Sequence, residues 1–447
     1  MSVVTDSPAY SSSIDDFIAF LDAALDANSP NASSDKEDGN QDEFESVRIK
    51  RRKFESIEET EGSASEGTKE RNLEASLEVD VCTHPASFEL ADSFETMCIH
   101  CGQKQKLDGK SGVKFGYIHK GLRLKEEEIS RLRDKDTKNL LLQKKLTLVL
   151  DLDHTLLNST DLVHLRSEEF DLLPQTDSLE DVSKGSLFKL EHMRMMTKLR
   201  PFVRTFLKEA NEIFDMYIYT MGDQPYALEM AKLLDPQAEY FYEKVISRDD
   251  GTQKDKKGLD VVLVEKSAIL ILDDTEHAWK EEDKENLILM ERYHFFPSSC
   301  QQFGLNCKSL AELKSDEDET DGPLSKILKV LKQVHCTFFD KLQDDLVGPD
   351  VRKVVRSEVL NGCVIVFSRI LHGALPTLRK MAEQMGATCV TELEPSVTHV
   401  VATDTGTEKS RWAVKENKFL VHPRWIKAAN YFWQKQPEEN FFLKKKK

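Results

Sequence analysis

A short apolar run that ends in two carboxylates and a hydroxyl constrains the fold of this chain more than any other feature. Residues 146–150 read Leu-Thr-Leu-Val-Leu, a pattern that favours a buried strand of a parallel sheet. Asp151, Asp153 and Thr155 follow directly. Because open α/β sheets bind their ligands at the carboxyl ends of their strands, the sequence predicts an α/β fold with a polar site at this strand end.

These three residues suit phosphoryl transfer. Asp151 can attack phosphorus and form an aspartyl phosphate, while Asp153 can protonate the leaving oxygen and later deprotonate the attacking water. Thr155 would hydrogen-bond within the loop and fix the pair. The two carboxylates repel each other, and a hard divalent cation such as Mg²⁺ would relieve that repulsion. Taken alone, the motif also fits an ordinary acidic turn after a strand.

Two later apolar runs also end in polar residues, one at Thr220 and one at Asp273 and Asp274. Thr220 can donate a hydrogen bond to a phosphate oxygen, and Lys257 can supply positive charge to the phosphoryl group. Asp273 and Asp274 would complete the magnesium site. Taken singly, Thr220 also fits a strand-end cap, and Lys257 a solvated lysine. As an ordered set, the three strand ends predict a phosphoryl-transfer enzyme.

The ordered motifs resemble the haloacid-dehalogenase superfamily. Within it they are most similar to the RNA polymerase II C-terminal-domain phosphatases of the TFIIF-interacting, BRCT-containing type, including the plant phosphatase-like proteins. The motifs are Asp151-Leu-Asp153-His-Thr155, Tyr219-Thr-Met-Gly222, Ser247-Arg248-Asp249 and Leu272-Asp-Asp274. The resemblance implies a nuclear protein-serine/threonine phosphatase that acts on the heptad repeats of the polymerase through an aspartyl phosphate and so regulates transcription.

The resemblance also implies a role for each matching residue. Asp151 would be the nucleophile and Asp153 the acid/base, while Thr220 and Lys257 would bind phosphate. The implied metal ligands are Asp151, Asp273, Asp274 and Asp153, the last through its carbonyl, with Mg²⁺ or alternatively Mn²⁺ bound. Lys257 is chosen over Lys256 because Lys257-Gly-Leu looks like the family's Lys-x-Leu. Arg200 and Arg248 match positions at the rim of the family's pocket and are candidate phosphopeptide contacts.

Composition limits the partners and the compartment. A chain of 447 residues is too long for one core. A net charge of −17 argues against direct binding to nucleic acid. No apolar run approaches membrane-spanning length, and the first residues lack the pattern of a secretory signal. We therefore expect an intracellular protein in a reducing compartment, without a membrane or nucleic-acid partner.

Residues 1–75 are polar and poor in aromatics, a composition that predicts a disordered acidic tail. Within it, residues 13–25 carry apolar side chains at helical spacing, so they would form an amphipathic helix that either folds onto a partner or packs nowhere in particular. The basic cluster at residues 48–53 fits a nuclear import signal. A patch that merely balances charge is the alternative.

Cysteine and histidine pairs predict a zinc-binding segment at residues 78–120. The expected ligands of this structural Zn²⁺ are Cys82, His84, Cys98 and Cys101. A Cys-x-x-Cys pair beside a Cys-x-His pair suits a tetrahedral site. His100 is an alternative imidazole ligand, and isolated buried thiols are the other interpretation. The plant-like members of the resembled family share this pattern.

The phosphatase domain is expected at residues 137–350. Its segment 157–196 has too little apolar content for an independent cap, so we expect an open pocket that admits a polypeptide. The acidic run at residues 315–319 is expected to be a solvated loop. Two rival functions stay open, a small-molecule phosphatase of the same superfamily and a catalytically weak BRCT-bearing scaffold of the transcription machinery.

Residues 357–445 resemble a small α/β BRCT domain, with a strand at 363–367, a helix ended by Gly386 and a later strand from Thr398. In phosphate-binding members, a hydroxyl and a lysine hold the phosphate, and Ser368 and Lys409 occupy those places. Arg369 stands where such members have glycine. This departure favours docking of a protein, for which a TFIIF-like factor is a candidate, over phosphate binding.

Overall fold

The computed structural model describes residues 86–89, 95–98, 104–106, 112–165, 167–342, 350–371 and 373–443. The chain divides into two compact units, 1–81 and 82–447, and all described residues belong to the second. The expected tail, amphipathic helix and basic cluster of residues 1–75 lie outside the described residues. In the described part of the chain, helices of membrane-spanning length and hydropathy are absent.

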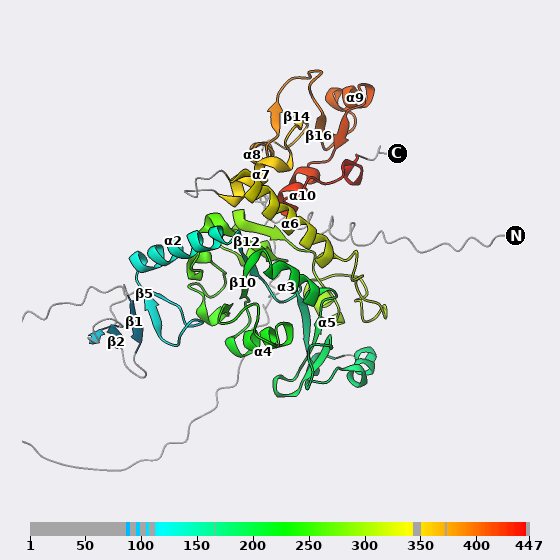
Figure 1. The fold of residues 1–447 in the computed structure, drawn as a ribbon. Helices are drawn as coiled ribbons and strands as arrows, with labels where there is room; N and C mark the ends of the chain where they lie inside the picture. The colour runs from blue at the N-terminus through cyan, green and yellow to red at the C-terminus, as the bar shows by residue number, and fades with distance from the viewer. Residues whose placement is uncertain are drawn as a thin grey trace, which may run out of the picture. The chain divides into compact units, whose positions relative to one another are not determined.

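A five-stranded parallel sheet forms the centre of the expected phosphatase domain (Figure 1). In spatial order its strands are β11 (Val245–Ile246), β10 (Phe214–Tyr219), β6 (Leu146–Leu150), β12 (Ile269–Asp273) and β13 (Leu287–Leu289). Every residue of β6 and β12 is buried. Leu150 pairs with Ile218 on one side and Leu272 on the other. This register brings Asp151, Thr220 and Asp273 to one edge, so the predicted parallel α/β sheet is confirmed.

Helices and short 3-10 turns connect and cover these strands. The helices are α2 (Glu126–Leu142), α3 (Val203–Asn211), α4 (Gln224–Leu234), α5 (Pro297–Gln302) and α6 (Pro323–Lys341). The 3-10 turns between β11 and β12 are η4 (Arg248–Asp250), η5 (Leu259–Val261) and η6 (Lys266–Ala268). Those between β12 and β13 are η7 (Glu276–Ala278) and η8 (Glu281–Asn286). Helix α2 contacts β6, α3 contacts β10, and α6 packs on α3 (Figure 1). The buried residues of α6 recur at helical spacing, because this face covers the core.

The packing of the phosphatase domain continues on the N-terminal side of the expected boundary at residue 137. The chain there forms an antiparallel sheet of β1 (Ala86–Glu89), β2 (Glu95–Cys98), β3 (Lys104–Lys106), β4 (Val113–Lys114) and β5 (Leu122–Leu124). Phe115 and Ile129 share a core cluster with Leu263. The Arg133 guanidinium donates to the carbonyls of Leu259, Asp260 and Val262. Cys82, His84 and Cys101 lie outside the described residues, so the zinc site stays a prediction.

The segment between the first two motifs contains a small antiparallel sheet that the sequence did not predict. Its strands are β7 (Leu157–Asp161), β9 (Met195–Leu199) and β8 (Leu187–Leu190), in that order, with 3-10 turns η1 (Leu162–His164), η2 (Ser167–Gln175) and η3 (Glu191–Met193) between them. Leu187 and Met196 pack against Tyr293, Phe295 and Phe296 of the expected phosphatase domain. The segment thus shares the core of the domain that carries it.

The C-terminal domain is a second, smaller α/β layer, as expected. Its parallel sheet has the order β15 (Thr388–Val390), β14 (Val364–Ser368), β16 (His399–Ala402) and β17 (Phe419–Val421), and its helices are α7 (Val351–Val359), α8 (Leu375–Gln384), α9 (Glu408–Lys415) and α10 (Arg424–Phe432), with η9 (Glu438–Phe441) after them. Gly386 has φ of +88°, and a Cβ there would lie 1.9 Å from the Ser357 carbonyl oxygen. Only glycine fits this close approach.

Candidate active site

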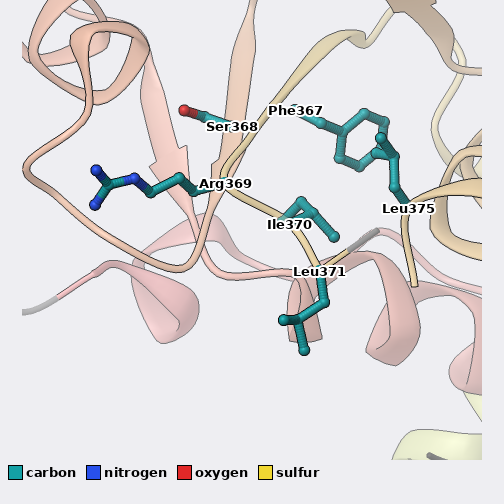
Figure 2. Close-up of a pocket in the computed structure, with 6 residues that line it drawn as sticks. All are labelled: Phe367, Ser368, Arg369, Ile370, Leu371 and Leu375. Carbon is teal, nitrogen blue, oxygen red and sulfur yellow. The ribbon is translucent and has the colours of Figure 1, made fainter. Parts of the chain in front are cut away.

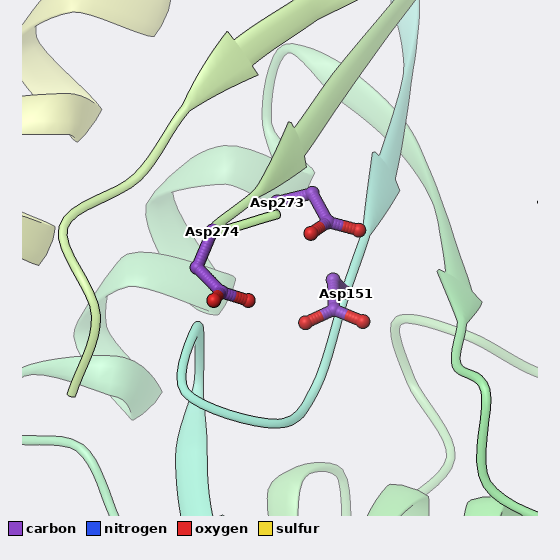
Figure 3. Close-up of side chains that lie close together, drawn as sticks. All are labelled: Asp151, Asp273 and Asp274. Carbon is purple, nitrogen blue, oxygen red and sulfur yellow. The ribbon is translucent and has the colours of Figure 1, made fainter. Parts of the chain in front are cut away.

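Three buried carboxylates meet at the carboxyl edge of the parallel sheet. Asp151 follows β6, and Asp273 and Asp274 stand at the end of β12. One carboxylate oxygen from each of the three residues lies within 4.8 Å of the other two. Figure 3 shows the three side chains turned toward a common space from two neighbouring strands. The parallel register of β6 and β12 thus brings together residues far apart in the sequence.

Lys257 bridges this carboxylate group. Its ammonium contacts the Asp151 carboxylate and donates to Asp273 Oδ2 at 2.6 Å. Burial alone would lower the pKa of Lys257, but Asp151 and Asp273 raise it above its ordinary value, so the side chain is cationic at neutral pH. Lys256 instead donates to the His277 carbonyl in an exposed hydrogen bond. Of the two neighbouring lysines, Lys257 is therefore the one at the site.

Asp153 lies between two hydroxyl groups. The Tyr226 hydroxyl donates to Asp153 Oδ1 at 2.5 Å, and Thr220 Oγ1 lies 3.4 Å from Oδ2. The intervening His154 has φ of +64°, and this turn carries the chain from the sheet into the loop. Thr155 Oγ1 accepts from the backbone N–H of Asp274 at 3.1 Å. The predicted role of Thr155 in fixing the loop thus extends to the loop after β12.

Three aspartates of the site have raised pKa values. Burial raises the pKa of Asp151 well above its ordinary value, and the Asp273 carboxylate raises it further. The pKa values of Asp153 and Asp273 are also raised, chiefly by burial. Among the described side chains, Lys257 and Arg292 are the cations that bind this group, so four carboxylates face two positive charges. Closely spaced, incompletely neutralised carboxylates suit a hard divalent cation, and the residues present therefore fit Mg²⁺.

Three residues of the site were missed by the sequence reasoning. Tyr226, on α4, binds Asp153. The indole of Trp279 donates to Asp273 Oδ2 at 2.8 Å, and Arg292 Nε donates to Asp274 Oδ2 at 2.6 Å. Nothing near these residues in the sequence distinguishes them from core aromatics or a surface arginine. Tyr226 lies 73 positions from Asp153, and Trp279, although it follows Asp273 by only 6 positions, has the pattern of a core aromatic.

The structure corrects the expectation for Arg200. Its side chain is 1% exposed, so it lies inside the domain and not at a rim. It forms a two-pronged ion pair with Glu317 at 2.7 Å and donates to the carbonyls of Thr155 at 3.0 Å and Glu291 at 2.8 Å. It also lies over the Tyr293 ring. These contacts make Arg200 a structural clamp behind the loop that carries Thr155.

The acidic run at residues 315–319 is accordingly not a fully solvated loop. The Asp316 carboxylate accepts from the Tyr293 hydroxyl at 2.8 Å and pairs with Lys198 at 3.0 Å. Glu317 is mostly buried against Arg200. The expectation was wrong for these two residues because each carboxylate has a cationic or hydroxyl partner from a distant segment.

Arg248 differs from Arg200 in its exposure. Its side chain is 44% exposed, and its backbone N–H donates to the carbonyl of Gly222, in the loop after Thr220. Ser247 and Asp250 form a capping box that fixes this turn. Arg248 is thus held beside the Thr220 loop with its guanidinium accessible from solvent.

The candidate phosphate-binding side chains of the C-terminal domain form hydrogen bonds and ion pairs with other groups of the protein. Ser368 donates to Thr407 Oγ1 at 2.8 Å, and Lys409 donates to the Thr391 carbonyl at 2.6 Å. Arg369 pairs with the Asp404 carboxylate at 2.7 Å. The neighbouring pocket, shown in Figure 2, has a volume of about 430 Å³ and is lined by Phe367, Ser368, Arg369, Ile370, Leu371 and Leu375. Its lining is largely apolar, which favours a protein ligand over a phosphate.

Comparison with known proteins identifies both domains. A model of the NLI interacting factor-like phosphatase family matches residues 146–340, and one of the BRCA1 C Terminus (BRCT) domain matches residues 355–429. RNA polymerase II C-terminal domain phosphatase-like 4 of Arabidopsis thaliana is 56% identical over 458 residues, which cover 100% of this chain and 98% of that protein. Phosphatase-like 3 of the same plant is 40% identical and covers 72% of this chain, which spans 27% of that protein.

A solved structure of Fcp1, an RNA polymerase II CTD phosphatase, aligns with 70% of this chain and 100% of the solved chain, with a TM-score of 0.48 and 24% identity. The resemblance drawn from the four motifs is confirmed by the relative that matches the whole chain. The chain belongs to the RNA polymerase II C-terminal domain phosphatase family.

Proposed function

We propose that this protein removes phosphate from serine residues in the heptad repeats of RNA polymerase II, in the nucleus, and thereby regulates transcription. One observation carries the proposal: Asp151 is buried at the sheet edge beside the Lys257 ammonium and two further carboxylates. A nucleophilic carboxylate, a fixed cation and a metal-binding set are the groups that aspartate-based phosphoryl transfer requires. The relatives named above as polymerase phosphatases support the substrate class.

The proposed reaction has two steps. An Asp151 carboxylate oxygen attacks phosphorus, the bond from phosphorus to the serine oxygen breaks, and the Asp153 carboxyl gives its proton to that oxygen. Asp153 then takes a proton from a water molecule, which attacks the aspartyl phosphate and releases inorganic phosphate. Thr220 and Lys257 would bind phosphoryl oxygens throughout. The raised pKa of Asp153 supports its role as an acid in the first step.

The residues that would hold Mg²⁺ are Asp151, Asp273 and Asp274, together with the backbone carbonyl of Asp153. When bound, the cation would neutralise charge on the phosphoryl group. We propose that Mn²⁺ can replace it, because both are hard cations that prefer oxygen ligands. Chelation with EDTA should abolish turnover, and either Mg²⁺ or Mn²⁺ should restore it. Full activity after chelation would remove the metal from the proposal.

The central test is the Asp151→Asn variant, measured on p-nitrophenyl phosphate and on a phosphorylated heptad peptide. An amide is nearly isosteric with the carboxylate but is not a nucleophile, so turnover of both substrates should vanish while the variant stays folded. Asp181→Asn, at an exposed position, is the matched control. Undiminished turnover in Asp151→Asn would refute the assignment.

A polypeptide substrate is favoured over a small molecule because the segment before the second motif shares the domain core and forms no separate cap domain. The test compares kcat/KM on the phosphopeptide with that on a panel of sugar and nucleotide phosphates. A preference for any small molecule would support the rival function. Arg248, accessible beside the Thr220 loop, is the proposed peptide contact, and Arg248→Ala should raise KM for the peptide but not for p-nitrophenyl phosphate.

We propose that the BRCT domain docks a protein, with a TFIIF-like transcription factor as the candidate. Leu371 is 80% exposed at the pocket of Figure 2. Leu371→Glu should therefore weaken binding of the factor while leaving turnover of p-nitrophenyl phosphate unchanged. Equal binding by the variant would exclude this pocket.

A structural Zn²⁺ bound by Cys82, His84, Cys98 and Cys101 stays part of the proposal on the basis of the sequence pattern alone. Metal analysis of the purified full chain should find about one zinc per chain, and Cys98→Ser with Cys101→Ser should remove it. Retained zinc in that double variant would contradict the ligand set.

A further inference from the structure

The last helix of the BRCT domain contacts the strand next to the metal-site strand. Trp433, at the end of α10, is 3% exposed and donates its indole N–H to the Leu287 carbonyl of β13 at 3.0 Å. β13 is the edge strand of the phosphatase sheet and pairs with β12, with Leu289 opposite Asp273. The BRCT domain is therefore hydrogen-bonded to the strand that flanks Asp273.

The backbone at Trp433 indicates that this contact is specific. Trp433 has φ of +50°, a left-handed conformation that is unfavourable for residues other than glycine. Such conformations persist where the surrounding structure fixes them. Here the Arg356 guanidinium lies 5.2 Å from the centre of the indole ring, and the indole N–H is bound to β13. Contacts with two elements thus hold the ring in place.

A second contact reaches the loop that follows the metal-site strand. The Tyr431 hydroxyl donates to Glu276 Oε2 at 3.0 Å. Glu276 begins η7, two residues after Asp274. At the other end of this turn, the Trp279 indole binds Asp273, and the Ala278 carbonyl accepts from the backbone N–H of Lys257 at 2.7 Å. The segment bound by Tyr431 therefore also carries partners of Asp273 and Lys257.

We infer that Tyr431 and Trp433 of the BRCT domain are positioning residues for the metal and phosphate site of the phosphatase domain. The inference rests on the proposed function. Two hydrogen bonds restrain β13 and the segment from Glu276 to Trp279, so the carboxylates of Asp273 and Asp274 are ordered before a cation arrives. Without these restraints, cation binding must order the loop as well, and the loss of conformational freedom weakens binding.

The test uses the full chain and the variants Tyr431→Phe, Trp433→Phe and both together. Each substitution removes one hydrogen-bond donor and keeps an aromatic ring. The controls are Tyr242→Phe, at a 71% exposed position, and Trp412→Phe, which packs against the BRCT core. The dissociation constant of Mn²⁺ is measured without substrate from the electron paramagnetic resonance signal of the free ion, and thermal unfolding is measured on the same samples.

We expect the Mn²⁺ dissociation constant to rise about threefold in each single variant and about tenfold in the double variant, with both controls unchanged. The Mg²⁺ concentration for half-maximal phosphatase rate should rise in parallel, while kcat at saturating Mg²⁺ stays within about twofold of the parent. A merely structural role would lower the unfolding temperature but leave the dissociation constant of the folded protein unchanged.

A double variant whose Mn²⁺ dissociation constant equals that of the parent would overturn the inference. That failure is distinct from a failure of the proposed function, which is decided by turnover in Asp151→Asn. A parent protein that binds no Mn²⁺ would overturn the inference and the metal part of the proposed function together.

Discussion

Glu317→Gln tests whether Arg200 is a buried clamp or a substrate contact. Arg200 gives two of its hydrogen bonds to the Glu317 carboxylate, and its side chain is shielded from solvent. Removing one charge of a buried pair costs about 3–5 kcal/mol. Glutamine keeps one acceptor oxygen, so we expect the free energy of unfolding to fall by about 2–3 kcal/mol. In a cooperative unit the size of the phosphatase domain, this corresponds to a loss of about 4–12 °C in the unfolding midpoint.

Calorimetry and steady-state kinetics together decide between the two roles. At a temperature where the variant is folded, KM for the phosphopeptide should stay within about twofold of the parent, because the Arg200 side chain is shielded from solvent. Glu319→Gln, at an exposed position in the same acidic run, is the control and should change neither quantity. An unchanged unfolding midpoint combined with a fivefold or greater rise in KM, on the order of 1 kcal/mol, would refute the clamp and restore Arg200 as a substrate contact.

Three further predictions follow from local geometry. A Cβ at Gly222 would lie 2.4 Å from the Tyr226 ring. Gly222→Ala should therefore displace the tyrosine from Asp153 and lower kcat about tenfold. An unchanged kcat would show that catalysis does not need the contact of Tyr226 with Asp153. Gly386→Ala should destabilise the BRCT domain in urea unfolding more than Gly362→Ala, because both have positive φ but only Gly386 faces a backbone oxygen; equal losses would contradict this packing argument. Burial lowers the pKa of His294 to about 4, below the ordinary value of about 6.5, so its contribution to stability is present above pH 6.5 and is lost as the pH falls toward 4. Between pH 7 and 5 the free energy of unfolding should drop by about 1–2 kcal/mol more in the parent than in His294→Gln, and parallel pH curves would contradict the assignment.

The parts of the fold visible in the sequence are those with a local signal. β6, β10 and β12 are apolar runs of five or six residues, long enough to be recognised, and the polar residues after them lie at one edge because the strands are parallel. The edge strands β11 and β13 have two and three residues, too few to show a pattern. Their place in the sheet is set by pairing with β10 and β12.

Tyr226, which was missed, and Arg200, which was misplaced, depend on distant partners. Tyr226 lies 73 positions from Asp153, and Glu317 lies 117 positions from Arg200. An arginine in a motif and an acid in a polar run give no sign that they form a buried pair. Lys257 was identified because its motif resembles that of the family, while spacing alone left it a choice between neighbouring lysines. Long-range pairing of polar side chains is thus the information that one sequence does not carry.

The long separations in this site also bear on when the enzyme becomes active during its own synthesis. The contact of Lys257 with Asp151 spans 106 positions, and the Arg200 clamp spans 117 and ends at Glu317. Closing such distances is slow compared with local folding, and a domain folds as a unit once its chain is available. A nascent chain whose synthesis has passed Asp274 but not reached Glu317 contains all four motifs but lacks the ion-pair partner of Arg200. The same holds for a chain that terminates between these two residues. We expect such a chain to be inactive, so that premature termination yields no partial phosphatase able to act on the polymerase.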